Sequence, residues 1–377
     1  MGILPKIDPD GLLEYSVVFS DRSLNQMSNK FKIIMREISN ELKNIYNSNS
    51  VVILPGGGTF GMEAIARQFG NDEKCLIIRN GWFGFRWSEV FRKGKIASDI
   101  KPIFAIPSEN SLGKNTKNTY SPPSLESIVK EIETFKPKLV CATHVETSAG
   151  LIMPNEYIKK IGEITKKNGG IFVLDCVASG TIFLDMKNLN IDVLLTAPQK
   201  GWSSSPCAAV IMLSQDAKNL IKDTESSSYA CDLKKWLTVM ESYENNGHLY
   251  HTTLPTDGIM FFRDNILESK SIGYEKITKL QIQLGNEMRN LTEHYGYLSV
   301  AAEGFKSPTV IVNHTDDEEI KSGKKFANLG IQIAAGMPLE IGEGDNFKSF
   351  RIGLFGLDKL LNIDRTVTNF KRALEQI

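Results

Sequence analysis

The sequence lacks the features that mark several large classes of protein. Its five cysteines are odd in number, scattered and without a Cys-x-x-Cys pair, which argues against a disulfide framework or a zinc site and predicts reduced thiols. Basic and acidic residues number 44 each, so no net charge favours nucleic acid or an acidic membrane as a partner. No apolar run approaches membrane-spanning length, and the N-terminus lacks the apolar core of a signal peptide. We therefore expect a cytoplasmic protein that binds no metal, nucleic acid or membrane.

What is present is an ordinary globular composition, 41% hydrophobic and 23% charged over 377 residues. This length suits two domains, or one large domain with an appendage. We find no internal repeat or low-complexity tract in the sequence.

The stretch 169–202 organises the chain. Its apolar run 171–174 predicts a strand buried on both faces of a parallel sheet, and the run ends at Asp175. A second predicted strand, 192–196, leads to Gln199 and Lys200. Open α/β proteins bind ligands at the carboxyl ends of their strands, so we expect Asp175 and Lys200 to meet at one edge of the sheet.

An acid and a lysine placed in this way suit pyridoxal phosphate chemistry. In that chemistry the lysine binds the cofactor covalently and the acid keeps the pyridine nitrogen protonated. Taken alone, the pair has a simpler interpretation, in which Asp175 caps a turn and Lys200 is a solvated surface residue.

A glycine-rich turn, 55–59, favours the first interpretation. It follows the apolar strand 51–54 and precedes a helical pattern that continues to Phe69. The free N–H groups of a first helical turn bind phosphate, and glycines let the backbone approach it. No Gly-Lys-Ser/Thr follows, so this is not a Walker loop. A tight strand–helix connection is the alternative, but beside Asp175 and Lys200 the turn is a good candidate for the cofactor phosphate.

Two further loops follow predicted strands. Residues 80–87 are dense in aromatic side chains, which either anchor a helix in the core or supply a ring that stacks on the cofactor. The loop 143–150 carries several hydroxyls and His144. We favour an orienting, hydrogen-bonding role for His144 over a role as general base.

The last hundred residues show a different pattern. From about residue 275 the order helix, strands, helix predicts a smaller α+β domain packed on the first. Arg351 lies on an apolar strand there, and burying an unpaired arginine is costly. A structural salt bridge and a clamp for a substrate carboxylate are both open interpretations.

Seven motifs together resemble fold-type I pyridoxal phosphate enzymes of aminotransferase class V, in particular the alanine–glyoxylate and serine–pyruvate aminotransferases. They are PGGGTFGMEA, NGWFGFRW, THVETSAGL, LDCVASGT, TAPQKGW, YHTTLP and FRIGLFG, and the similarity extends from about residue 24 to the C-terminus. The resemblance implies that Lys200 binds pyridoxal 5′-phosphate covalently and that Asp175 holds its ring nitrogen. It also implies the following roles: phosphate binding by Gly57, Gly58, Thr59 and Gln199; ring stacking by Phe83; a contact on the O3′ side by Ser148; contacts to the neighbouring subunit's phosphate by Tyr250 and Thr253; and substrate-carboxylate binding by Arg351.

The chain departs from these relatives at residues 19–23, where they have a glycine–proline loop that lines the substrate site. Arg22 in this segment either points into the pocket or pairs with Asp21 or Glu14, and we favour the pair. Cysteine desulfurase activity is disfavoured, because Gln199 stands where those enzymes have histidine and no cysteine follows Cys231.

We therefore expect an N-terminal arm (1–23), a large α/β domain with a mostly parallel, doubly wound sheet (24–258) and a smaller α+β domain (259–377). The expected activity is a ping-pong aminotransferase reaction from a small amino acid such as alanine or serine to glyoxylate or pyruvate, in a homodimer. The alternatives are an aminophosphonate transaminase, a pyridoxal phosphate-dependent lyase and, less favoured, a non-catalytic protein that keeps the fold.

Overall fold

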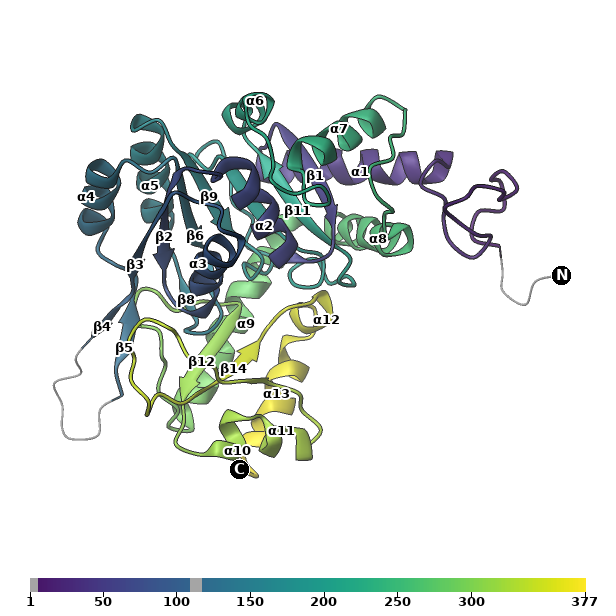
Figure 1. The fold of residues 1–377 in the computed structure, drawn as a ribbon. Helices are drawn as coiled ribbons and strands as arrows, with labels where there is room; N and C mark the ends of the chain where they lie inside the picture. Colours follow the sequence, from purple (N-terminus) through teal and green to yellow (C-terminus); the bar gives the residue numbers. More distant parts are fainter. Residues whose placement is uncertain (1–5, 109–116) are drawn as a thin grey trace.

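The computed structural model describes residues 6–108 and 117–377. A seven-stranded sheet forms the centre of the larger unit (Figure 1). In spatial order its strands are β1 (Ser50–Pro55), β11 (Ala208–Leu213), β10 (Val193–Thr196), β9 (Ile171–Asp175), β6 (Leu139–Thr143), β2 (Lys74–Arg79) and β3 (Asp99–Phe104). Strand β11 is antiparallel to both neighbours, and the other pairs are parallel. The predicted mostly parallel sheet is confirmed.

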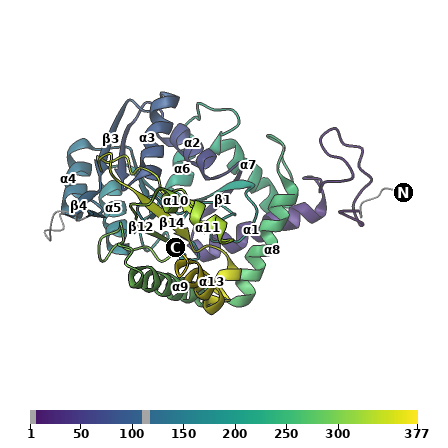
Figure 2. The ribbon, with the colours of Figure 1, turned by 90° about the horizontal axis from the view of Figure 1, so that it is seen from below.

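Helices cover both faces of this sheet (Figures 1 and 2). On one face α2 packs with α3, and on the other face α4 packs with α5. The chain crosses the sheet toward β3 through α2 and α3 and returns toward β9 through α4 and α5. Because crossover connections are right-handed, the two directions place the helices on opposite faces. The helices of this unit are α1 (Asn29–Tyr46), α2 (Gly58–Phe69), α3 (Trp82–Gly94), α4 (Leu125–Phe135), α5 (Asn155–Lys167), α6 (Gln215–Asp223), α7 (Leu233–Glu244) and α8 (Thr256–Ile272). Because both faces are covered, the central strands β6, β9 and β10 are buried along their whole length.

The C-terminal unit contains a second, smaller sheet with its own core. Its strands are β12 (Val310–His314), β14 (Ser349–Gly353) and β13 (Ala334–Ala335), with antiparallel pairing. Its helices are α9 (Tyr274–His294), α10 (Glu318–Lys321), α11 (Lys324–Asn328), α12 (Leu357–Leu360) and α13 (Ile363–Leu374). Helix α8 contributes Ile259, Phe262 and Ile266 to the core of the larger unit, and Ile277 of α9 belongs to the core of the smaller one. The division at residues 258 and 259 stays a prediction.

Four short strands pair in two ribbons, β4 (Ile106–Ser108) with β5 (Thr119–Ser121) and β7 (Val145–Glu146) with β8 (Leu151–Ile152). A third apolar cluster joins Val145 and Ala178 of the larger unit to Val310 and Val312 of β12. The two units therefore pack directly on each other. Among the residues that the structure describes, no helix is long and apolar enough to cross a bilayer.

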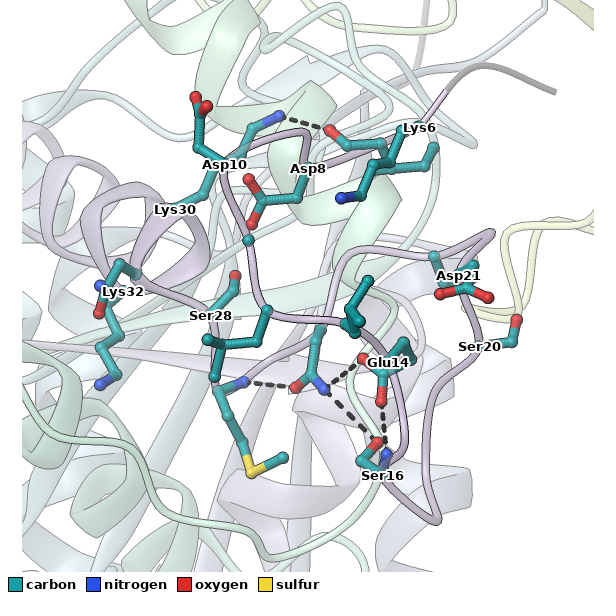
Figure 3. A pocket seen from close by; sticks show the side chains of 18 of the residues that line it. Lys6, Asp8, Asp10, Glu14, Ser16, Ser20, Asp21, Ser28, Lys30 and Lys32 are labelled. Atoms are coloured by element: carbon teal, nitrogen blue, oxygen red, sulfur yellow. Dashed lines mark hydrogen bonds between the residues drawn. The ribbon is translucent and has the colours of Figure 1, made fainter. Parts of the chain in front are cut away.

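The N-terminal arm projects from the body beside α1 (Figures 1 and 2), and residues 1–5 of the predicted arm lie outside the described residues. The arm and α1 enclose a pocket of about 850 Å³ (Figure 3). Residues 19–23 belong to this arm, so they do not line the cavity around Lys200 in the same chain. Glu14 accepts hydrogen bonds from the Ser16 N–H at 2.8 Å and the Asn25 amide at 2.7 Å. Among the described residues Arg22 forms an ion pair with neither Glu14 nor Asp21, so the expected pair is not found.

Candidate active site

A cavity of about 220 Å³ lies at the carboxyl ends of the parallel strands, and its lining residues belong to the larger unit. Its walls include six residues that the sequence analysis named: Gly58, Thr59, Phe83, Asp175, Gln199 and Lys200. They come from four separate segments of the chain. The parallel topology brings them together, because successive strands end at the same edge of the sheet.

Asp175 is the last residue of β9, and its side chain is almost fully buried. Its Oδ1 accepts a hydrogen bond from the Val177 N–H at 3.0 Å. Burial raises the pKa of Asp175 to about 6, although the Val177 N–H and the positive charge of Arg86 oppose the shift. A carboxylate with this pKa is ionised at neutral pH and can hold the proton of a heterocyclic nitrogen by a charge-assisted hydrogen bond.

Lys200 follows β10, and its amine stands 5.0 Å from the centroid of the Phe355 ring, which comes from the smaller unit. Burial lowers the pKa of Lys200, and the nearby charges of Arg351 and Arg86 lower it further. A lysine with a lowered pKa has more of its amine in the neutral form that attacks carbonyl carbon and takes up protons.

The start of α2 forms one end of the cavity. Gly57 is the N-cap residue, and its lack of a side chain leaves the first turn without a side-chain cap. A Cβ at Gly57 would meet no atom within 4 Å, whereas a Cβ at Gly58 would lie 2.8 Å from the Val177 side chain. Open N–H groups at a helix N-terminus, reached through glycine, suit a phosphate. Gly57 itself is not among the cavity walls, although Gly58 and Thr59 are.

Three polar atoms of the cavity walls are buried without a hydrogen-bond partner among the described residues: Thr143 Oγ1, Thr147 Oγ1 and Gln199 Oε1. Buried polar groups are normally paired, so unpaired ones in a cavity indicate a polar ligand. Together with the acid, the lysine and the open helix start, this set of donors and acceptors fits pyridoxal 5′-phosphate.

The Ser148 side chain does not line this cavity, and its expected contact on the O3′ side of the cofactor stays a prediction. It is fully buried, donates its hydroxyl hydrogen to Glu146 Oε1 at 2.7 Å and accepts a hydrogen bond from the Trp82 N–H at 2.9 Å. The neighbouring Thr147 lines the cavity instead. The reason is that hydrogen bonds to α3 hold this loop, and they turn Ser148 away from the cavity.

Glu146 is the centre of that contact. Its carboxylate also accepts hydrogen bonds from the N–H groups of Phe83 and Gly84 at the start of α3, at 3.2 and 3.0 Å. Burial raises the pKa of Glu146, and these hydrogen bonds oppose the shift. A Cβ on Gly81 would lie 2.3 Å from Ser148 Oγ, so only glycine permits this approach. Phe83 thus enters the cavity from a helix start that is fixed by Glu146.

Arg351 lies on β14, where its Nε donates to the Ala335 carbonyl at 2.8 Å. It is not among the cavity walls, but it is close enough for its charge to lower the pKa of Lys200. Among the described residues no acidic side chain forms an ion pair with Arg351. The salt-bridge interpretation is therefore not supported, and apart from Nε the guanidinium nitrogens have no hydrogen-bond partner among the described residues.

Tyr250 and Thr253 lie outside the cavity of their own chain. The two hydroxyls are 3.3 Å apart, and the Tyr250 side chain is exposed. Their expected contact with a neighbouring subunit stays a prediction.

His144 is buried and hydrogen-bonded through Nδ1 to the Ser179 hydroxyl at 2.7 Å. Burial lowers its pKa to about 4, so the imidazole is neutral, and it is not among the cavity walls. These contacts agree with the orienting role and not with a general base.

Three polar residues of the cavity walls were not expected from the sequence: Arg86, Thr143 and Thr147. Arg86 belongs to the aromatic motif 80–87. It follows Phe83 by one helical turn, and this spacing could have indicated that both side chains lie on the same face of the helix. Thr143 and Thr147 stand in the hydroxyl-rich loop, whose composition did not distinguish the residues that face the cavity.

Comparisons with known proteins identify the family of the chain. A family model described as aminotransferase class-V matches residues 111–338, which is more than half of the chain. The chain is similar to alanine–glyoxylate aminotransferase of Oryctolagus cuniculus, at 24% identity over 365 residues, with 93% of this chain and 87% of the relative covered. It is also similar to the bifunctional phosphonoacetaldehyde hydrolase/aminoethylphosphonate transaminase of Clostridioides difficile, at 24% identity over 272 residues, or 69% of this chain and 38% of the relative.

Among solved structures, alanine–glyoxylate aminotransferase from Nostoc superposes with a TM-score of 0.78 at 20% identity, covering 94% of this chain and 89% of the other. The fold is thus that of the fold-type I pyridoxal phosphate enzymes. The chain belongs to the aminotransferase class-V family, and it is a pyridoxal phosphate-dependent transaminase.

Proposed function

We propose that this protein transfers the amino group of a small amino acid, such as alanine or serine, to glyoxylate or pyruvate. The observation that carries the proposal is Arg351, a half-buried guanidinium close to Lys200 that forms no ion pair with a described residue. A planar fork of this kind binds a carboxylate with two parallel hydrogen bonds.

The size of the cavity supports a small donor. Its volume of about 220 Å³ lies below the range of about 300–1,000 Å³ that is usual for ligand pockets. Phe83 forms one wall, and the Phe355 ring approaches Lys200 from the smaller unit. Little room is left beyond the reacting carbon, which favours the side chains of alanine and serine over longer ones.

The proposed chemistry assigns one task to each residue. The cofactor, when bound, supplies the electron sink that stabilises negative charge on the substrate Cα. Lys200 would hold the cofactor covalently and, once released, would take the proton from the substrate Cα and deliver it to the cofactor C4′. Asp175 keeps the ring nitrogen protonated, and Phe83 packs on the ring face. Gly58, Thr59 and Gln199 hold the phosphate, and Arg351 orients the substrate carboxylate.

An aminophosphonate transaminase is the second candidate. It is favoured by the presence of Arg86 in the cavity wall, where a second cation is available for an anionic donor. The similarity to an aminoethylphosphonate transaminase points the same way.

We propose that the working form is a homodimer, in which Tyr250 and Thr253 contact the phosphate of the neighbouring subunit. The exposed Tyr250 and the position of both hydroxyls outside their own cavity support this arrangement. The described residues include five free cysteines, which suits a reducing compartment such as the cytoplasm.

A donor screen tests the proposed function. Purified protein is mixed with alanine, serine, aspartate or 2-aminoethylphosphonate, and the absorbance of the cofactor is followed. Conversion of the band near roughly 410–420 nm to one near roughly 330 nm by alanine or serine is expected, because the cofactor then carries the amino group. Conversion by 2-aminoethylphosphonate alone would select the second candidate.

A further inference from the structure

We infer that Arg86 supplies the positive charge for the phosphoryl group of the cofactor at the start of α2. This inference rests on the proposed cofactor chemistry and adds a residue to it. Neither the glycine turn nor Gln199 carries a charge, yet a phosphate monoester is close to a dianion at neutral pH.

Contacts within the protein place Arg86 at that end of the cavity. It lies on α3 (Trp82–Gly94), and its Nη1 donates a hydrogen bond to Thr59 Oγ1 at 3.1 Å. Its guanidinium stands 4.6 Å from the centroid of the Phe83 ring. The stacked ring and the Thr59 oxygen together fix the direction of the guanidinium, since both contacts are geometrically selective.

The Thr59 hydroxyl links Arg86 to the helix start. Because Oγ1 accepts the Arg86 N–H, its own hydrogen remains available to donate to a phosphate oxygen. The first turn of α2 has no side-chain cap, and its residues Gly58 and Thr59 line the same cavity. Side-chain cation, hydroxyl and backbone donors therefore converge on one position.

Arg86 is the charged residue of the cavity walls that has no other proposed role, so it is available to bind the phosphate. Among the described residues the cavity walls hold three charged side chains, Asp175, Lys200 and Arg86. Asp175 pairs with the protonated ring nitrogen, and Lys200 becomes the covalent attachment point. No described acidic side chain forms an ion pair with Arg86, whereas Arg92 on the same helix is paired with Glu89 at 2.6 Å.

A separate observation shows that the cavity accepts a polar ligand. The hydroxyls of Thr143 and Thr147 line it without a partner, although the two residues are only 1% and 8% exposed. These hydroxyls stand apart from α2, so the evidence for a ligand does not depend on the helix start.

The test compares the dissociation constants of pyridoxal 5′-phosphate and of pyridoxal, which lacks the phosphate, for the apoprotein. Arg86→Gln should weaken pyridoxal 5′-phosphate binding by on the order of 10–100-fold, the usual effect of losing a charge-assisted hydrogen bond, and leave pyridoxal binding unchanged. The dissociation constant of Arg86→Lys for pyridoxal 5′-phosphate should lie between those of the wild type and Arg86→Gln. Lysine keeps the positive charge but lacks the planar guanidinium that donates two parallel hydrogen bonds and stacks on Phe83. Inorganic phosphate should bind the wild-type apoprotein and not Arg86→Gln.

Arg92→Gln is the matched control, since it removes an exposed arginine of the same helix and should change neither constant. Equal losses for both ligands, or no loss for either, would overturn the inference. So would an unchanged pyridoxal 5′-phosphate constant together with a raised KM for 2-aminoethylphosphonate, which would place the donor's phosphonate against Arg86. Borohydride labelling of Lys200 in the wild type separates this inference from the proposed function. If no label forms, the proposed function fails. If the label forms while Arg86→Gln binds pyridoxal 5′-phosphate as tightly as the wild type, only the role of Arg86 is wrong.

Discussion

The hydroxyl of Ser148 lies 2.7 Å from Glu146 Oε1, and this hydrogen bond joins the loop 143–150 to the start of α3. It decides which hydroxyl of the loop is free for a ligand, because Thr147 then faces the cavity. The two neighbouring residues are therefore expected to have separable effects.

Ser148→Ala should lower the free energy of unfolding by about 1–3 kcal/mol, because the Trp82 N–H loses its buried acceptor and Glu146 its donor. Thr147→Val should weaken cofactor binding by about 3–10-fold, the effect of one lost neutral hydrogen bond, with little change in apoprotein stability. Urea unfolding and cofactor titration of both variants give the comparison. The reverse pattern would return Ser148 to the cavity.

Asp175 should make the stability of the apoprotein depend on pH. Burial raises its pKa from 3.8 to about 6, so the folded protein retains a proton that the unfolded chain has already lost between these values. The stabilising contribution is complete below about pH 4 and is lost as the pH rises through about 6. At pH 8, Asp175→Asn apoprotein should therefore be more stable than wild type by up to about 3 kcal/mol, and near pH 4 the two should agree.

The substitution Asp175→Asn should lower turnover, although it stabilises the apoprotein at pH 8. Asp175→Asn cannot hold a protonated ring nitrogen, so kcat should fall by about 10²-fold or more. Cofactor binding should also stabilise the variant less than the wild type, measured as the shift in Tm on adding the cofactor. A variant that is as active as wild type would show that another group holds the nitrogen.

Borohydride reduction of the cofactor-loaded protein should leave one covalent pyridoxyl group, on Lys200. The lowered pKa of this amine leaves more of it in the neutral form that attacks a carbonyl carbon. Peptide mass spectrometry locates the label, with Lys200→Ala as the control. A label on a different lysine would remove the central assignment.

Arg351→Gln should reduce kcat/KM for alanine, mainly by raising KM, since it removes the clamp for the α-carboxylate. The loss should correspond to an increase of about 2–4 kcal/mol in the activation free energy. Amine donors without an α-carboxylate should react as before. Arg351→Gln should also raise the pKa of the Lys200 amine, because one of the charges that lower it is gone. Equal losses for donors with and without the carboxylate would point to a structural role.

Mixing Lys200→Ala with Thr253→Val protein tests the shared site. If Thr253 serves the neighbouring subunit, a heterodimer combines both lesions in one site and leaves the other intact. Random pairing of an equal mixture should then restore about a quarter of wild-type activity. A mixture no more active than its components would show that Thr253 acts in its own subunit or not at all.

The amino-acid pattern was enough to locate the strand that ends at Asp175, the strand that leads to Lys200 and the helix that follows the glycine turn 55–59. Continuous apolar runs mark buried parallel strands, and the spacing of apolar residues marks a helix face, so both can be recognised within a short window. The convergence of Asp175, Lys200 and Gly58 followed from topology alone, because parallel strands end at one edge.

Three features depended on contacts between distant segments. Thr147, and not Ser148, faces the cavity because Glu146 binds the start of α3, some sixty residues earlier in the chain. Arg86 reaches Thr59 at the start of α2 because α3 packs beside α2. Residues 19–23 extend away with the arm instead of lining the site. Loop side chains have no period, so long-range hydrogen bonds and packing set their directions, and no local pattern in the sequence records them.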